Sequence, residues 1–240
     1  MRPSGGGAAP APEAEWARLE RAIVRCRRCP RLVAHRGAVA RAKRRQYRDE
    51  HYWGRPVPGF GDHRARLLIV GLAPAAHGAN RTGRMFTGDR SGDWLYAALH
   101  ATGFASQPTS LRRGDGLALR DAWISAAARC APPDNAPLPA EFDACRDYLV
   151  RELALLQPAL RVVVALGGLA LANVLRAWSA AGHPLPRPRP RFGHAAEARL
   201  SERVTLLCSY HPSQQNTFTG RLTRAMLEGV FARAAALARG

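Results

Sequence analysis

Four short apolar segments, separated by stretches with helical patterning, constrain the fold of this chain most strongly. They span 66–71, 121–127, 161–167 and 204–208. Nearly continuous apolar runs of this length are typical of parallel strands that are buried on both faces. Helical patterns follow these runs at 91–102, 139–156, 168–178 and 221–238. Strands that alternate with helices predict a single-domain α/β fold, in which ligands bind at the carboxyl ends of the strands.

The segment before the first strand is basic and helical. Apolar residues at Trp16, Leu19 and Ile23 predict an amphipathic helix over 13–26, and a second helix is expected over 31–45. Residues 16–48 include twelve basic residues and one acidic residue, Glu20. The first dozen residues are rich in Gly, Pro and Ala. We therefore expect 1–12 to be a disordered tail and 13–240 to be one domain.

The net charge of the chain is large and positive. The sequence has 36 Lys and Arg against 18 Asp and Glu, which gives a formal charge of +18. Such an excess predicts a polyanionic partner, with nucleic acid as the first candidate, although a solvated helix face is the alternative for any one basic segment. No apolar run approaches the roughly 18 to 20 residues that span a bilayer. We expect a soluble, cytoplasmic and nucleoid-associated monomer without membrane contact.

Four cysteines have a spacing that is typical of a metal centre. Cys26 and Cys29 form a Cys-x-x-Cys pair, and Cys130 and Cys145 follow about a hundred residues later. Thiolates in this arrangement bind zinc or an iron-sulfur cluster, and the spacing alone does not separate the two. Scattered buried cysteines are the alternative, which we expect for Cys208 in its apolar strand. An odd number of cysteines argues for metal binding under reducing conditions rather than a disulfide scaffold.

Two loops at expected strand ends have far more polar and glycine residues than simple connections require. The first, 71–89, contains Gly-Leu-Ala-Pro-Ala-Ala-His-Gly, Asn-Arg-Thr-Gly-Arg and Phe-Thr-Gly-Asp. The second, 209–221, contains Ser-Tyr-His-Pro-Ser-Gln-Gln-Asn-Thr, and the sequence Arg-Cys-Ala-Pro-Pro occupies 129–133. Loops of this composition at the end of a parallel sheet predict a ligand site.

With these five motifs in order and the four cysteines, the chain resembles the uracil-DNA glycosylase superfamily, most closely its family 5, the type b enzymes with an iron-sulfur cluster. The resemblance implies a four-stranded, mainly parallel sheet between helices. It also implies excision of uracil and other deaminated bases, such as hypoxanthine and xanthine, from damaged DNA to leave an abasic site. The implied cofactor is a 4Fe-4S cluster, with zinc as the alternative, on Cys26, Cys29, Cys130 and Cys145.

The residues of the two loops suit the hydrolysis of a glycosidic bond. The base departs as an anion, so the enzyme must bind its negative charge and admit a water below the sugar. His211, just beyond the last strand, is our candidate hydrogen-bond donor to the base; a histidine that only caps a loop is the alternative. No carboxylate occurs at 72–76, so Asn80 is the candidate that orients the water, with His77 and Asp89 as substitutes.

Phe86 is the candidate surface on which a flipped base stacks, and a core phenylalanine is the alternative. We expect the base pocket to include Ser125 at the end of the second strand, where related enzymes often have Asn. This difference predicts relaxed selectivity for uracil. The other residues expected to bind substrate are Gly71, Ala73, Pro74 and Ala75.

We expect further contacts with the DNA around the lesion. Gln214, Gln215 and Asn216 are candidates to fill the space that the flipped base leaves, although solvated loop residues would look the same. The only lysine, Lys43, lies in the basic segment, so a Schiff base is not expected and the glycosylase should be monofunctional. The alternative function is a non-enzymatic metal-cluster protein that binds nucleic acid. The candidate phosphate-binding residues are Arg81, Arg84 and Arg221.

Overall fold

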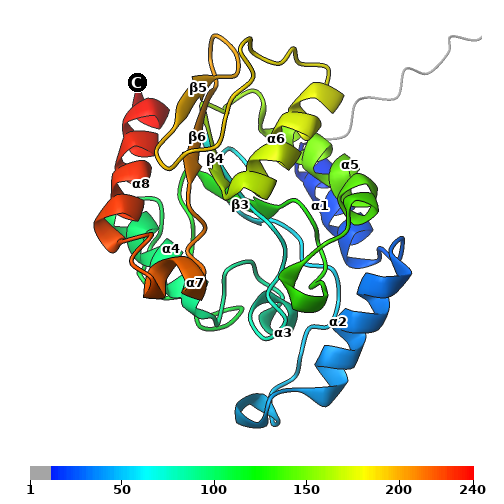
Figure 1. Ribbon diagram of the computed structural model, residues 1–240. Coiled ribbons are helices and arrows are strands. Elements are labelled where there is room, and N and C mark those ends of the chain that lie inside the picture. Colours follow the sequence, from blue (N-terminus) through cyan, green and yellow to red (C-terminus); the bar gives the residue numbers. More distant parts are fainter. Residues whose placement is uncertain (1–11) are drawn as a thin grey trace, which may run out of the picture.

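A mixed β-sheet between two layers of helices forms the centre of the protein, in a computed structural model that describes residues 12–240 (Figure 1). Within these residues the sheet has six strands in the order β1-β3-β2-β4-β6-β5. The inner four, β3, β2, β4 and β6, are parallel, and the outer two pair antiparallel with their neighbours. The strands are β1 (Phe60–Gly61), β2 (Leu67–Gly71), β3 (Ala122–Ala126), β4 (Val162–Leu166), β5 (Glu197–Arg199) and β6 (Thr205–Ser209).

The four predicted parallel strands are confirmed, and the prediction of a four-stranded sheet omitted the two edge strands. β1 has two residues and β5 has three, too few to show a periodic pattern. Neither edge strand is buried, whereas all five residues of each inner strand are buried. Only the inner strands therefore carry the continuous apolar signal.

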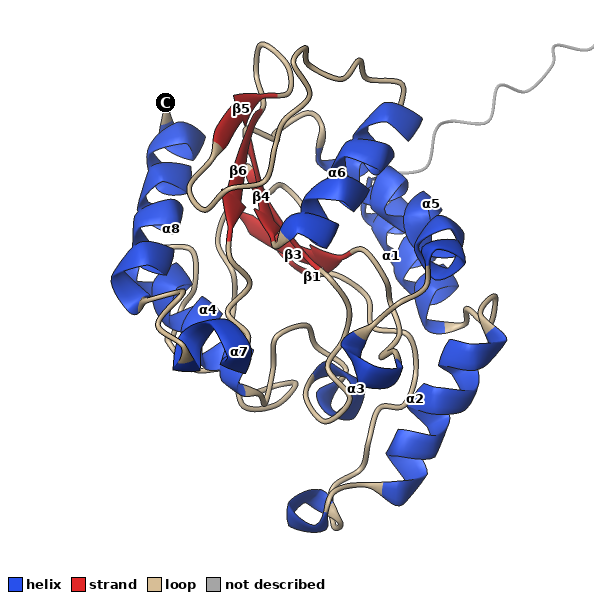
Figure 2. Cartoon of the chain, in the orientation of Figure 1, coloured by secondary structure: helices blue, strands red, loops and turns tan. Residues whose placement is uncertain are grey.

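Helices cover both faces of the sheet, as Figure 2 shows. Side chains of α4 and α8 pack with Ile69, Ile124 and Val164 on one face. Side chains of α1, α5 and α6 pack with Val70 and Val163 on the other. The long helices are α1 (Pro12–Val24), α2 (Pro30–Ala42), α4 (Arg90–Ala101), α5 (Pro139–Leu156), α6 (Gly168–Ala180) and α8 (Arg224–Arg239).

All six predicted helices are present, with one correction at an N-terminus. Asp89, rather than Ser91, caps α4, because its carboxylate accepts a hydrogen bond of 3.0 Å from the amide of Gly92. Of the predicted tail, residues 1–11 lie outside the described part of the chain, and Pro12 already begins α1. No helix in the described range is both long and apolar enough to cross a membrane. Short helices absent from the prediction are α3 (Ala79–Thr82), η1 (Arg45–Tyr47), η2 (Pro133–Asn135) and α7 (Gln214–Phe218).

A buried ion pair joins the end of β3 to helix α5. Arg129 donates to the carboxylate of Glu152, and each side chain is 1% exposed. The hydroxyl of Ser125 donates to the same carboxylate oxygen. The other oxygen of Glu152 and two nitrogens of Arg129 have no hydrogen-bond partner among the described residues. A pair with so few supporting hydrogen bonds recovers little of its desolvation cost, so each charge depends on the other.

We predict that Glu152→Leu lowers the free energy of unfolding by about 3–5 kcal/mol, because it leaves the Arg129 charge buried without a partner. The double variant Arg129→Met/Glu152→Leu should recover most of that loss, since it removes both charges together. Urea unfolding at neutral pH measures both values. A double variant no more stable than the single one would contradict this account.

Candidate active site

The loops that follow β2 and β6 bring Phe86 and His211 together. Their ring centroids lie 5.7 Å apart, with an angle of 33° between the ring planes. The two residues are separated by more than a hundred positions in the sequence, and parallel strands place the loops after them at the same end of the sheet. The predicted meeting of these two side chains is present in the structure.

Phe86 reaches this position through an unusual backbone conformation and a close contact. Its φ is +53°, in the left-handed region that costs a non-glycine residue about 1–3 kcal/mol. A Cβ atom on Gly71 would lie 2.8 Å from Cζ of Phe86, so the ring needs a glycine at the end of β2. A Cβ atom on Gly92 would lie 1.9 Å from the carbonyl oxygen of Phe86. Glycine at positions 71 and 92 therefore leaves room for the ring and the backbone of Phe86.

His211 is uncharged at neutral pH. Burial lowers the pKa of its imidazole to about 4. A neutral imidazole has one N–H donor, which is what a carbonyl oxygen of a departing base requires. The carbonyl of His211 accepts a hydrogen bond of 2.8 Å from the side chain of Asn216, which fixes the start of α7 next to it.

Asn80 is fully buried within the first loop, on the short helix α3. Its amide nitrogen donates to the carbonyls of Arg36 and Ala76, at 3.2 Å and 3.4 Å. Its side-chain oxygen has no hydrogen-bond partner among the described residues. Only this oxygen is left to accept a hydrogen bond from a water.

The two substitutes for Asn80 are engaged elsewhere. Nδ1 of His77 lies 3.0 Å from the hydroxyl of Tyr52, and burial together with the charges of Arg44 and Arg81 lowers the pKa of His77. Asp89 caps α4, and burial raises the pKa of its carboxyl. Both side chains therefore hold the loop in place.

The other candidate substrate residues differ in position. Pro74 is buried, Ala73 packs against a small cluster that includes Cys145, and the carbonyl of Ala75 accepts from the amide of Asn80 at 3.0 Å. The hydroxyl of Ser125 points to Glu152, on the α5 face of the sheet, whereas Phe86 packs on the α4 face. The Ser125 side chain is therefore directed away from the Phe86–His211 pair.

Two of the three arginines predicted to bind phosphate are inside the protein. Arg84 is 4% exposed and pairs with Asp115, whose pKa the guanidinium keeps well below its usual range. Arg81 is 6% exposed, pairs with Glu50, and donates to the carbonyls of His77 and Gly88 at 2.8 Å and 2.9 Å. Both side chains hold the first loop together rather than stand at the surface.

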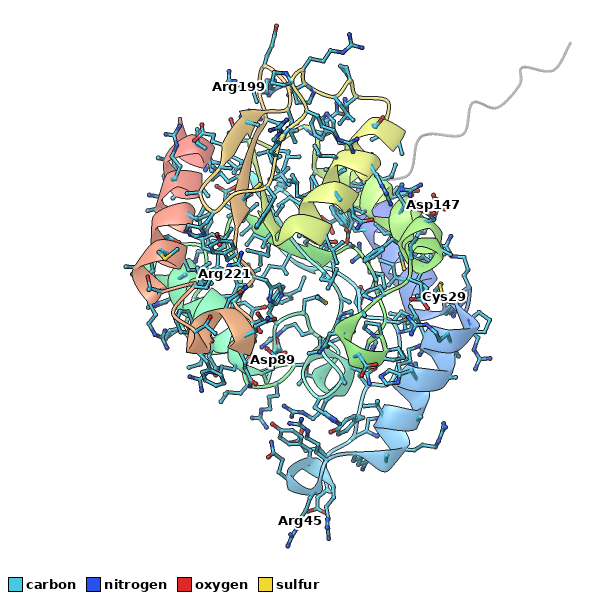
Figure 3. All side chains as sticks on the ribbon, in the orientation of Figure 1. Cys29, Arg45, Asp89, Asp147, Arg199 and Arg221 are labelled. Carbon is cyan, nitrogen blue, oxygen red and sulfur yellow. The ribbon has the colours of Figure 1, made fainter. Side chains whose placement is uncertain are left out.

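Arg221 is exposed, as a phosphate contact requires, and Figure 3 shows it beside α7. Its guanidinium lies over the ring of Tyr210, 4.6 Å from the centroid. Gln214 and Gln215 are exposed on α7, and Phe218, at the end of that helix, is 65% exposed. Two similar pairs that sequence reasoning missed, because their partners are distant in the chain, are Arg90 over Phe218 and Arg224 over Trp94.

The four predicted cysteine ligands lie in one electrostatic neighbourhood. Cys26 follows α1, Cys29 precedes α2, Cys130 follows β3, and Cys145 lies on α5. Burial, together with a smaller effect of the other three thiols, raises the pKa of the Cys130 thiol to about 12. Among the described residues, no three His, Cys, Asp or Glu side chains are close enough together to hold a single metal ion. Cys208 is buried in β6, as expected, and burial rather than another thiol raises its pKa.

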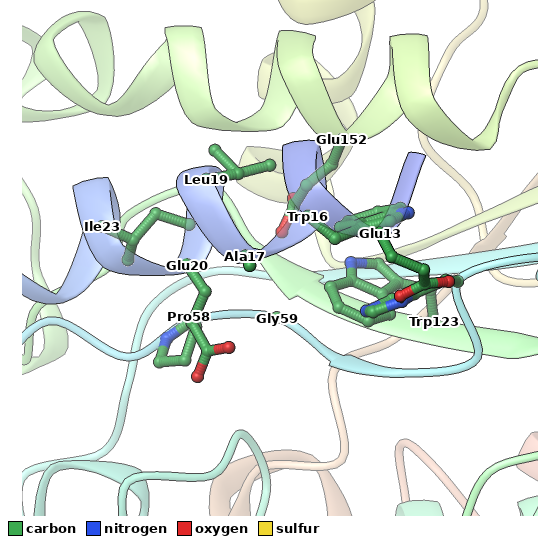
Figure 4. A pocket seen from close by; sticks show the side chains of 11 residues that line it. Glu13, Trp16, Ala17, Leu19, Glu20, Ile23, Pro58, Gly59, Trp123 and Glu152 are labelled. Atoms are coloured by element: carbon green, nitrogen blue, oxygen red, sulfur yellow. The ribbon is translucent and has the colours of Figure 1, made fainter. Parts of the chain in front are cut away.

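A cavity of about 150 Å³ lies between α1 and the loop that precedes β2, as Figure 4 shows. Trp16, Trp123 and Glu152 are in its wall. Neither Phe86 nor His211 lines it. We therefore assign no role in base binding to this cavity.

Comparison with known proteins agrees with the geometry. The family model described as the uracil DNA glycosylase superfamily matches residues 58–235. A type-5 uracil-DNA glycosylase of Mycobacterium tuberculosis is 56% identical over 213 residues, which cover 89% of this chain and 78% of the relative. The type-5 uracil-DNA glycosylase of Mycobacterium leprae is 54% identical over 97% of this chain and 98% of its own. That of Thermus thermophilus is 50% identical over 90% of this chain and 95% of its own. The chain belongs to the uracil DNA glycosylase superfamily.

Proposed function

We propose that this protein is a monofunctional uracil-DNA glycosylase of base excision repair, which hydrolyses the N-glycosidic bond of uracil in DNA and leaves an abasic site. The observation that carries the proposal is the pairing of Phe86 with a neutral His211 at the carboxyl ends of β2 and β6. Relatives that match nearly the whole chain are named type-5 uracil-DNA glycosylases, which supports the same activity.

His211 stabilises the leaving group. As the bond between the base and the sugar breaks, its electron pair moves onto the base, and the N–H of the imidazole donates to the carbonyl oxygen that gains charge. His211 is half-buried beside Phe86. A donor in such a site is worth more than one in water, because the local dielectric is lower. Phe86 offers its ring as the surface on which the base lies.

Water completes the reaction: its oxygen forms a bond to C1′ of the sugar, and its proton goes to solvent or to the departed base anion. No carboxylate lies at 72–76, so the first loop has no general base there, and the side-chain oxygen of Asn80 is the acceptor that can orient the water. Absence of a general base removes about 10²- to 10⁴-fold in rate. Catalysis therefore rests mainly on stabilisation of the departing base.

We also propose that hypoxanthine and xanthine are substrates. The hydroxyl of Ser125 is engaged by Glu152, and Ala126 and Ala127 follow it, so no side chain at the end of β3 is available to select the hydrogen-bonding edge of uracil. Selectivity of this kind requires a polar partner that is left unpaired by the wrong base.

A 4Fe-4S cluster on Cys26, Cys29, Cys130 and Cys145 is the proposed cofactor. The mutual effect of the thiols on their pKa values supports a shared site. When bound, the cluster would fasten the helices α1 and α2 to the loop after β3 and to α5. Zinc on the same cysteines is the alternative, and metal analysis of the purified protein distinguishes it from iron.

The first prediction from this proposal concerns the activity itself. A duplex oligonucleotide with one deoxyuridine, incubated with the protein and then treated with alkali, should break at that position. His211→Ala should lower the single-turnover rate constant about 10²- to 10³-fold, because it removes one donor to the developing negative charge. Deoxyinosine in the same position tests the broader selectivity.

His183→Ala is the matched control, because His183 packs against Trp178 near the end of α6, away from Phe86 and His211. It should leave the rate constant unchanged. Binding of the oligonucleotide without cleavage by the unaltered protein would favour a non-enzymatic nucleic-acid-binding function instead.

The second prediction concerns pH. Because the pKa of His211 is lowered to about 4, the imidazole stays neutral as the pH falls through the ordinary histidine value of about 6.5. The single-turnover rate constant should therefore show no step near that pH that depends on His211. Profiles of the unaltered protein and of His211→Ala test this, and a step lost only in the variant would refute it.

The third prediction concerns the metal. Protein purified without oxygen should be brown, with iron and acid-labile sulfide in equal amounts. Cys29→Ser should lower the iron content strongly, whereas Cys208→Ala, a buried cysteine outside the cluster, should not. Colourless protein that contains zinc on the same cysteines would overturn the iron-sulfur assignment.

A further inference from the structure

We propose that the end of α2 and the adjoining η1 form a second DNA-binding surface, which contacts the phosphates of duplex DNA away from the lesion. We call residues 41–48 the basic protrusion. The proposal rests on DNA being the substrate, as argued above, and adds a contact outside the site of base excision. The basic side chains of the protrusion are those of Arg41, Lys43, Arg44, Arg45 and Arg48.

The charges of the basic protrusion are available to a partner. All four of its arginines are exposed, and none of them has an ion pair among the described residues. Lys43 donates to the carbonyl of Arg48 at 2.8 Å. Of the acidic residues that follow, Glu50 pairs with buried Arg81, which leaves Asp49 as the nearby carboxylate. A solvated surface normally mixes charges of both signs, whereas residues 41–48 include no carboxylate.

Buried Arg81 fixes the basic protrusion to the active-site loop. Its guanidinium lies 3.9 Å from the centroid of Tyr47 in η1 and also pairs with Glu50. The same side chain donates to the carbonyls of His77 and Gly88, which flank Phe86 in the first loop. An arginine with partners in both segments holds the protrusion at a set distance from the base-binding site.

Tyr52 makes a second connection between these segments. Its hydroxyl accepts a hydrogen bond of 3.3 Å from the amide of Arg44 and lies 3.0 Å from Nδ1 of His77. The protrusion is thereby tied to the loop after β2 through the ring of Tyr47 and through the backbone amide of Arg44. Such a surface is built rigidly into the site rather than being a mobile basic tail.

The position of the protrusion favours duplex DNA as its partner. Figure 3 places Arg45 at the lower tip of the molecule, Arg221 beside α7, and Arg199 at the opposite end of the sheet. Asp89, at the end of the first loop, lies between Arg45 and Arg221 in this view. A duplex is stiff over far more than the length of this protein, so one that enters the site continues straight past it. The protrusion lies where flanking phosphates can meet it.

Charge removal tests the proposal with a matched control. The variant Arg44→Gln/Arg45→Gln removes two exposed charges from the protrusion, and Arg199→Gln/Arg203→Gln removes two exposed charges from the opposite end. Affinity for a deoxyuridine duplex of about 30 base pairs is measured over a range of salt concentrations. Each phosphate contact contributes about 0.9 to the slope of log affinity against log salt. The first variant should reduce that slope by about 2, and the second should leave it unchanged.

Substrate length separates this proposal from the proposed function. A single strand of roughly five nucleotides is too short to reach from the site of base excision to the protrusion. Excision from it should be unchanged in both variants. Equal slopes for the two variants, or a loss of short-strand excision in the first, would overturn the second surface. If the unaltered protein excises no base from any substrate, the proposed function fails, while the salt slopes still decide whether the protrusion binds DNA.

Discussion

The contact between the ring of Phe86 and the backbone of Gly71 is the constraint on which the site depends. It allows the loop after β2 to fold back over the end of the sheet, in a conformation that a residue other than glycine adopts only under strain. Arg81 and Arg84 are buried in this loop and stabilise it from within through their partners Glu50 and Asp115. The aromatic surface beside His211 therefore results from packing and buried charge, rather than from the local preference of the chain.

Arginine has two different uses in this molecule. Side chains such as Arg84 and Arg129 are buried and each faces one carboxylate, so they contribute to the fold and not to the surface potential. Others, such as Arg221 and Arg45, are exposed and lie on aromatic rings or in solvent. Because these buried pairs are neutral, most of the excess of +18 is carried by the surface, where it can attract a polyanion.

The sequence predicted the features that follow from a local pattern or from the order of the strands. The inner strands and the long helices follow from apolar periodicity, and the meeting of Phe86 with His211 follows from the rule that loops after parallel strands share one end of the sheet. The roles of Arg81 and Arg84 did not follow, because their burial depends on carboxylates about thirty positions away. The cap of α4 was displaced by two residues because Asp89 and Ser91 are both good capping residues, and only the backbone conformation distinguishes them.

The hydrogen bond from Ser125 to Glu152 ties the end of β3 to the buried ion pair between Arg129 and Glu152. A larger side chain at this position would have to give up the carboxylate, which would then keep Arg129 as its sole partner. A substitution of Ser125 therefore lowers the stability of the protein unless α5 changes at the same time. Evolution at position 125 is thus constrained by a helix that is far from it in the sequence.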